Sequence, residues 1–122
     1  PYPAQIRATI EQIMQNYFPQ HVWTLAYQSK VGPIAWLSPS TDEVLPELAE
    51  KGVQNILVVP ISFVSDHLET LYEIDILYGE LAKSSKIEHF HRTPMLDTHP
   101  DFIETLAKLV KNKMALVEGQ RV

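Results

Sequence analysis

The nine residues SDHLETLYE, positions 65–73, place three carboxylates and one imidazole close together in the chain. They directly follow NILVVPISFV, a run with almost no polar side chains. Carboxylates and imidazoles bind divalent metal ions and also transfer protons. The segment is therefore either the start of a well-capped helix or a site that handles a metal ion.

The helix-start interpretation accounts for the first two acids. Asp66 and Glu69 have the spacing of a capping box, and acids in a first turn are stabilised by the helix dipole. Glu73 lies beyond that turn and one turn from Glu69, where like charges destabilise a helix by a few tenths of a kcal/mol, roughly. A cation between Glu69 and Glu73 would remove this repulsion, which favours a metal-handling site.

The helical period also breaks in this segment. Asp75 falls in the middle of the apolar face, whereas Ile74 and Leu77 fall on the acidic side. A π-bulge would re-phase the helix, and ordinary irregularity is the alternative. His67 lies about 200° from Glu69 in a regular helix. Either the helix begins after His67, or His67 faces a different side of the site.

Composition restricts the class of protein. The chain has 122 residues, a net charge of −5 and no cysteine. This length suits one domain with a single core. The negative charge argues against a nucleic-acid binder, and no apolar run is long enough for a membrane span. Without cysteine, this segment holds no iron–sulfur cluster and no disulfide. The other histidines lack partners at ligand spacing and are interpreted as structural.

The remaining patterns alternate between helix and strand. Helices are predicted over 3–17, 41–51, 66–83 and 98–117, and strands over 22–27, 55–61 and 87–91. The apolar run from Asn55 to Ile61 is typical of a strand covered on both faces. We therefore expect an α/β fold with a parallel sheet and helices on both faces. Ligands of such sheets lie beyond the carboxyl ends of strands, where SDHLETLYE and the loop QSKVGPIAW both fall.

Two longer stretches resemble the ferrochelatase family. These are QSKVGPIAWLSPSTDE, from Gln28 to Glu43, and VPISFVSDHLETLYEID, from Val59 to Asp75. Ferrochelatases are lyases that insert Fe²⁺ into a porphyrin to form haem. The resemblance begins at the PYP of residues 1–3 and continues to the last predicted helix. It implies a Rossmann-like, class II chelatase-like domain over residues 1–122, corresponding to the last third to half of a ferrochelatase.

The resemblance also implies roles for individual residues. The family's His-x-Glu corresponds to His67 and Glu69, with a further acid at Glu73, on a helix that contains a π-turn. These three residues are the expected catalytic groups, and Glu69, His67 and Asp66 are the expected metal ligands. Two aromatic residues, Trp36 and Phe63, correspond to porphyrin-cleft residues, with core packing as the alternative for both.

The family pattern is incomplete in this chain. A second important histidine of the family lies in a segment upstream of Pro1, so we expect the N-terminal half of the enzyme to be absent. An acid that extends the carboxylate row in some members is Leu77 here. We expect Fe²⁺ as a substrate and no tightly bound cofactor. The expected location is cytoplasmic in bacteria, or the matrix side of the mitochondrial inner membrane in eukaryotes.

Partners and alternatives follow from the same reasoning. The expected partners are porphyrin, Fe²⁺ and either the missing half or a second copy, with peripheral membrane contact in the full-length protein and no nucleic acid. One alternative function is that of another class II tetrapyrrole chelatase. The other is a catalytically silent α/β fragment that binds its missing half.

Overall fold

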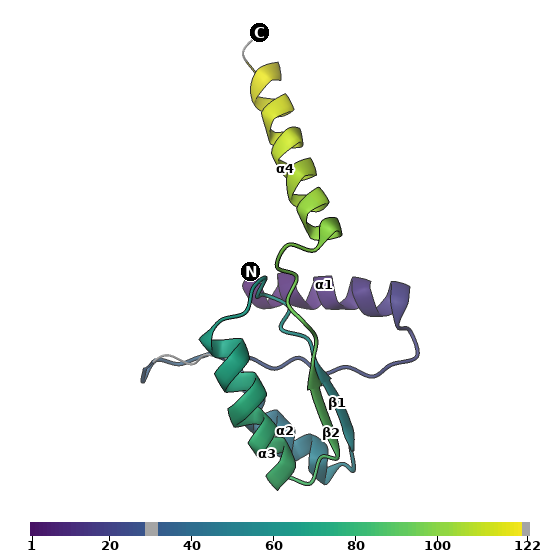
Figure 1. The fold of residues 1–122 in the computed structure, drawn as a ribbon, viewed down its shortest axis with the longest axis vertical. Coiled ribbons are helices and arrows are strands. Elements are labelled where there is room, and N and C mark those ends of the chain that lie inside the picture. Colours follow the sequence, from purple (N-terminus) through teal and green to yellow (C-terminus); the bar gives the residue numbers. More distant parts are fainter. Residues whose placement is uncertain (29–31, 121–122) are drawn as a thin grey trace.

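The computed structural model describes residues 1–28 and 32–120. It contains helices and a two-stranded parallel sheet (Figure 1). One of the helical segments is a π-helix. In chain order the elements are α1 (Tyr2–Tyr17), α2 (Thr41–Glu50), β1 (Asn55–Val58), η1 (Glu69–Tyr78), α3 (Gly79–Ser84), β2 (His89–Arg92) and α4 (Pro100–Gly119).

The helix boundaries follow local sequence signals. α2 begins at the predicted capping box: Glu43 Oε2 accepts from the backbone N–H of Ser40, 3.0 Å away. It ends before Gly52, whose φ of 83° is readily adopted only by glycine. α4 begins at Pro100, because a proline at the first helical position lacks only an N–H that would be unpaired there. These three predictions are confirmed.

The sheet is parallel, as predicted, with Asn55 of β1 opposite His89 of β2 and Val58 opposite Arg92. Its burial differs from the prediction. The inward face carries Ile56 and Phe90, which pack with α2 and α3, whereas Leu57 on the other face is 63% exposed. Within the described residues, helices therefore cover only one face, because neither α1 nor α4 packs against the sheet.

The predicted strand over 22–27 is wrong. This segment has no regular structure apart from a single parallel bridge between Tyr27 and Ser40. The Tyr27 N–H donates to Pro39 O at 2.9 Å, and the Thr41 N–H donates to Tyr27 O at 3.0 Å. Val22 is 98% exposed. β-Branched and aromatic residues favour a strand only where a neighbouring strand pairs with them, and 22–26 have no such neighbour among the described residues.

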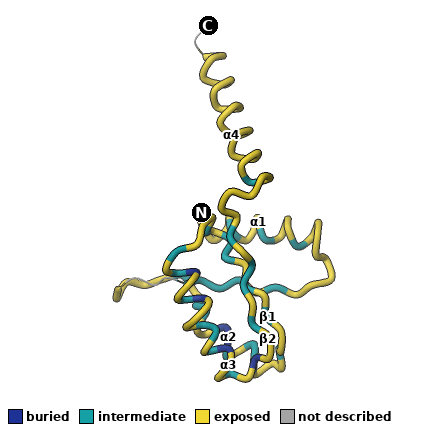
Figure 2. The backbone as a smooth tube through the Cα atoms, viewed as in Figure 1, coloured by how far each residue is buried: buried dark blue, intermediate teal, exposed yellow. Residues whose placement is uncertain are grey.

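The core lies between the helices and one face of the sheet. Leu45 of α2, Ala82 of α3 and Ile87 form its buried cluster. Thr70 and Ile74 of η1 are both fully buried, four residues apart. Burial in Figure 2 is concentrated at the α2, α3 and sheet end of the molecule. The site segment is thus attached to the best-packed part of the described chain.

The first and last helices stand apart from this core. α1 and α4 have no buried residue, and neither packs against another element of the described chain. In Figure 2 both helices are almost entirely exposed, and α4 projects away from the sheet. Among the described residues, no helix is long and apolar enough to cross a membrane.

Candidate functional site

The site segment begins beyond the carboxyl end of β1 and enters a π-helix. η1 starts at Glu69, so His67 precedes the helix. The Gly79 N–H donates to Ile74 O, five residues earlier, which is the hydrogen-bond spacing of a π-helix. Of the two alternatives for His67, the later helix start is therefore the one observed. The predicted re-phasing near Asp75 is also confirmed, and it extends over the whole of η1.

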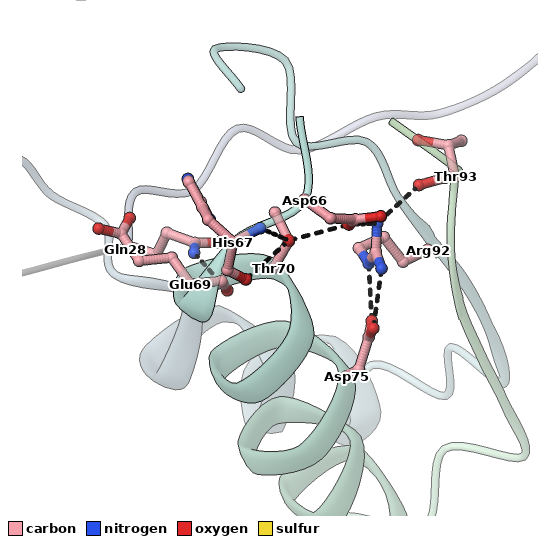
Figure 3. Close-up of polar contacts among 8 residues, drawn as sticks. All are labelled: Gln28, Asp66, His67, Glu69, Thr70, Asp75, Arg92 and Thr93. Carbon is pink, nitrogen blue, oxygen red and sulfur yellow. Dashed lines mark hydrogen bonds and ion pairs between the residues drawn. The ribbon is translucent and has the colours of Figure 1, made fainter. Parts of the chain in front are cut away.

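Arg92, at the end of β2, explains why Asp75 lies on the apolar face of the helical pattern. Its Nε and Nη2 donate to the two carboxylate oxygens of Asp75 at 2.7 and 2.8 Å, and its Nη1 lies 3.1 Å from Asp66 Oδ1 (Figure 3). The Arg92 side chain is only 12% exposed. Hydrogen bonding to Arg92 lowers the pKa of Asp75, and the positive charge of Arg92 adds to this against the opposite effect of desolvation.

The backbone of His67 is fixed by Thr70. The His67 N–H donates to Thr70 Oγ1 at 3.0 Å, and the Thr70 hydroxyl lies 3.0 Å from Asp66 Oδ1 and 3.1 Å from His67 O. The N–H groups of Thr70 and Leu71 donate to His67 O at 3.1 and 2.9 Å. The turn that carries His67 is thus bonded at both its N–H and its carbonyl.

The ring of His67 packs edge-on against Phe63, with ring centroids 4.4 Å apart. His67 Nδ1 is buried and has no hydrogen-bond partner among the described residues. Phe63 is half-buried and contributes to orienting this imidazole. The prediction that Phe63 walls a porphyrin cleft stays a prediction.

Trp36 and Glu73 line a common pocket of about 550 Å³ beside η1. Its lining also includes Asp42 and Glu43 from the start of α2, with Leu77 and Tyr78 from η1. Trp36 is 48% exposed, and its indole N–H donates to Gln28 O at 3.0 Å. Trp36 is therefore not packed in the core of the described residues, and its assignment to a porphyrin cleft stays a prediction.

Gln28 connects this loop to the start of η1. Its side-chain amide donates to the carbonyl of Glu69 at 3.2 Å, while its own carbonyl accepts from Trp36. In Figure 3, Gln28 lies on the Glu69 side of the helix start, and Arg92 lies on the opposite side with Asp75. The first turn of η1 is therefore held from two directions.

Tyr78 provides an electrostatic signature of the pocket. Desolvation and, to a smaller extent, the negative charges of Glu73 and Asp42 together raise the pKa of the Tyr78 phenol to about 12, against an opposite effect of its hydrogen bond with Thr41. Burial and the two neighbouring carboxylates both disfavour a negative charge on this phenol, so the pocket disfavours added negative charge.

The structure brings some predicted site residues together and separates others. Asp66, His67 and Glu69 are consecutive or nearly so, and Glu73 and Trp36 share a pocket, but Phe63 is not part of that pocket. Within 1–28 and 32–120, no three His, Asp or Glu side chains are grouped closely enough to hold a metal ion. Sequence reasoning missed Arg92 and Gln28. The sequence signal that could have indicated Arg92 is Asp75, because a carboxylate on an apolar helix face requires a positively charged partner.

Comparisons with known proteins identify the family of this chain. Residues 1–114 match the family profile described as Ferrochelatase. Similar curated proteins include "Ferrochelatase" of Rippkaea orientalis, 55% identical over 114 residues, and "Ferrochelatase" of Gloeothece citriformis, 52% identical over 114 residues. Each match covers 93% of this chain and 30% of the relative's length. The chain thus spans less than a third of the relatives it matches. It belongs to the ferrochelatase family.

Proposed function

We propose that this chain forms the metal-side wall of a ferrochelatase active site, where Fe²⁺ enters a porphyrin and two pyrrole protons leave. The observation that carries the proposal is the placement of Glu69 and Glu73 one turn apart on a π-helix, with His67 two residues before its first residue. The family match and the names of the relatives support the same reaction.

Each residue has a chemical part in this proposal. Glu69 accepts a pyrrole proton or binds the incoming iron, since a carboxylate can do both. His67 presents its imidazole on the same wall, with its ring held by Phe63. Glu73 extends the negative charge into the pocket, which attracts Fe²⁺ and carries protons away. We assign Asp66 to holding the helix start, because its carboxylate already contacts Arg92 and Thr70.

The porphyrin contact is assigned to Trp36. A flat macrocycle requires an apolar wall with few polar groups, and the exposed indole beside Glu73 supplies one. The hydrogen bond from the indole N–H to Gln28 O fixes the orientation of this wall. Fe²⁺ and porphyrin are substrates in this scheme, and the chain needs no resident cofactor of its own.

The exposed apolar helices support a further part of the proposal. One face of α4 carries side chains that are about half exposed: Ile103 47%, Leu106 43%, Val110 58% and Met114 56%. An apolar face of this extent is unusual on a monomer and marks a contact surface. We propose that the rest of a ferrochelatase covers it and supplies the opposite wall of the porphyrin cleft.

A chimeric enzyme tests the function. The matched 114-residue segment of the Rippkaea orientalis protein is replaced by the corresponding part of this chain, and haem formation from Fe²⁺ and protoporphyrin is followed by absorbance. The proposal predicts turnover comparable to that of the unmodified relative. A folded chimera that binds porphyrin but inserts only another divalent metal would point to a different tetrapyrrole chelatase. A folded chimera without any insertion would contradict the proposal.

A further inference from the structure

We propose that Arg92 is a positioning residue for iron insertion: its guanidinium fixes the start of η1, and through it His67 and Glu69, relative to the sheet. The inference deepens the proposed function and rests on it. Arg92 lies on β2, far along the chain from the acidic segment, and neither the local sequence pattern nor the predicted catalytic set includes it.

The first step is the double contact of one guanidinium. Arg92 binds Asp66, just before η1, at 3.1 Å, and both oxygens of Asp75, inside η1, at 2.7 and 2.8 Å. The two carboxylates enclose the turn that carries Glu69. A single cation therefore fixes this turn at its entry and again further along the helix, as Figure 3 shows.

The second step transmits this restraint to His67. Asp66 Oδ1, held by Arg92, accepts from the hydroxyl of Thr70, and that hydroxyl accepts from the His67 N–H. Thr70 is completely buried, so water does not compete for these bonds. The result is a continuous chain of contacts from the guanidinium to the backbone of His67.

The third step is that Arg92 is itself held by strand pairing and by hydrogen bonds next to it. It is the last residue of β2, paired with Val58, and the next N–H, that of Thr93, donates to Val58 O at 2.9 Å. Its Nη1 also donates to Thr93 O at 3.2 Å. A π-helix is a rare backbone form that occurs mostly as single turns, so the ten residues of η1 depend on tertiary contacts of this kind.

Lysine cannot replace this arginine. The contacts require a planar fork with several N–H donors pointing in fixed directions, and an ammonium on a flexible chain offers a single charged point. Arg92→Lys therefore keeps the charge and the approximate volume but removes the geometry. This substitution therefore distinguishes a positioning role of Arg92 from a role in which only its positive charge matters.

The activity test uses the chimera described above. Arg92→Lys is expected to lower kcat by roughly tenfold to a hundredfold, the size of effect that a small misplacement of reacting groups produces. The KM for porphyrin is expected to change little, because Trp36 is held by Gln28 and not by Arg92. The matched control is Arg7→Lys, the same substitution on α1, where Arg7 stacks over Trp23. Equal kcat in the Arg92→Lys and Arg7→Lys chimeras would overturn the inference.

A second measurement does not depend on turnover. Amide hydrogen exchange in the full chain is expected to accelerate at His67, Thr70 and Leu71 in Arg92→Lys, while the His89 amide, bonded to Gln54 O, keeps its rate. Uniform acceleration would show a general loss of stability, and no acceleration would show that Arg92 does not hold the helix start; either result overturns the inference. If the unmodified chimera proves inactive, the proposed function fails, whereas the exchange result still decides what Arg92 positions.

Discussion

Arg92 and Asp75 join the end of β2 to the middle of η1 through two hydrogen bonds of 2.7 and 2.8 Å, although 17 residues separate them in the chain. The guanidinium holds the pKa of Asp75 below its ordinary value of 3.8. Because the folded state favours the charged carboxylate, the pair stabilises the fold above the ordinary carboxyl pKa. This contribution is lost as the pH falls through the lowered pKa of the folded state.

The first prediction concerns this pair. Asp75→Asn should lower the free energy of unfolding at neutral pH by about 1–2 kcal/mol, between the values for exposed ion pairs and for hydrogen bonds to charged groups. The difference between the two proteins should shrink as the pH falls below 3.8. Urea unfolding over a pH series measures both effects. A difference that stays constant across the series would show that the charge of Asp75 does not contribute.

The second prediction concerns Glu69. In the chimera, Glu69→Gln should reduce turnover by about 10²–10⁴-fold, the usual contribution of a positioned proton acceptor, with little change in thermal stability. The amide keeps the shape of the side chain but neither accepts a proton at neutral pH nor carries charge. Glu47→Gln, an exposed residue paired with Lys51, is the matched control. Normal turnover with a lowered Tm would make Glu69 a structural residue.

Local signals in the sequence identified the helices because their causes are local. The capping box of Ser40 and Glu43 lies within one turn. Pro100 favours the start of a helix because its ring fixes φ near the helical value. The broken period around Asp75 indicated a π-helical segment for the same reason, since the phase of side chains along a helix is visible in the sequence.

The sequence could not specify contacts that depend on distant partners. The segment 22–27 has strand-forming residues but pairs only at Tyr27, because a strand requires a neighbour that sequence alone does not place. Arg92 was missed because its partners lie on another element. The burial of the sheet was overestimated for a related reason. An apolar run such as NILVV shows that both faces of the strand are apolar, but it does not show which elements cover them.

The third prediction uses Tyr78. In an alkaline titration followed by tyrosinate absorbance, Tyr78 should give a step at about pH 12. Since folding raises this pKa above its ordinary value of 10.0, the associated stability is complete below that value and is lost as the pH rises toward 12.

Two variants make the Tyr78 prediction specific. Tyr78→Phe should remove the late step, and Glu73→Gln should move it to lower pH, because the charge of Glu73 contributes to the shift. Tyr17→Phe, at a residue 74% exposed, should leave the late step in place. A titration of the folded protein that shows no step at about pH 12 would contradict the pocket environment described above.

The last prediction concerns the uncovered face of α4. The isolated chain should insert Fe²⁺ far more slowly than a full-length enzyme, and it should self-associate, because its apolar helix faces have no cover within the described residues. Sedimentation over a range of concentrations measures the association. Val110→Gln, at a side chain of that face that is 58% exposed, should weaken it without loss of stability, whereas Lys108→Gln, about 200° away on the same helix, should not. Addition of the remaining part of the Rippkaea orientalis enzyme should replace self-association with a one-to-one complex. A chain that stays monomeric at high concentration and ignores that partner would show that the α4 face is not a contact surface.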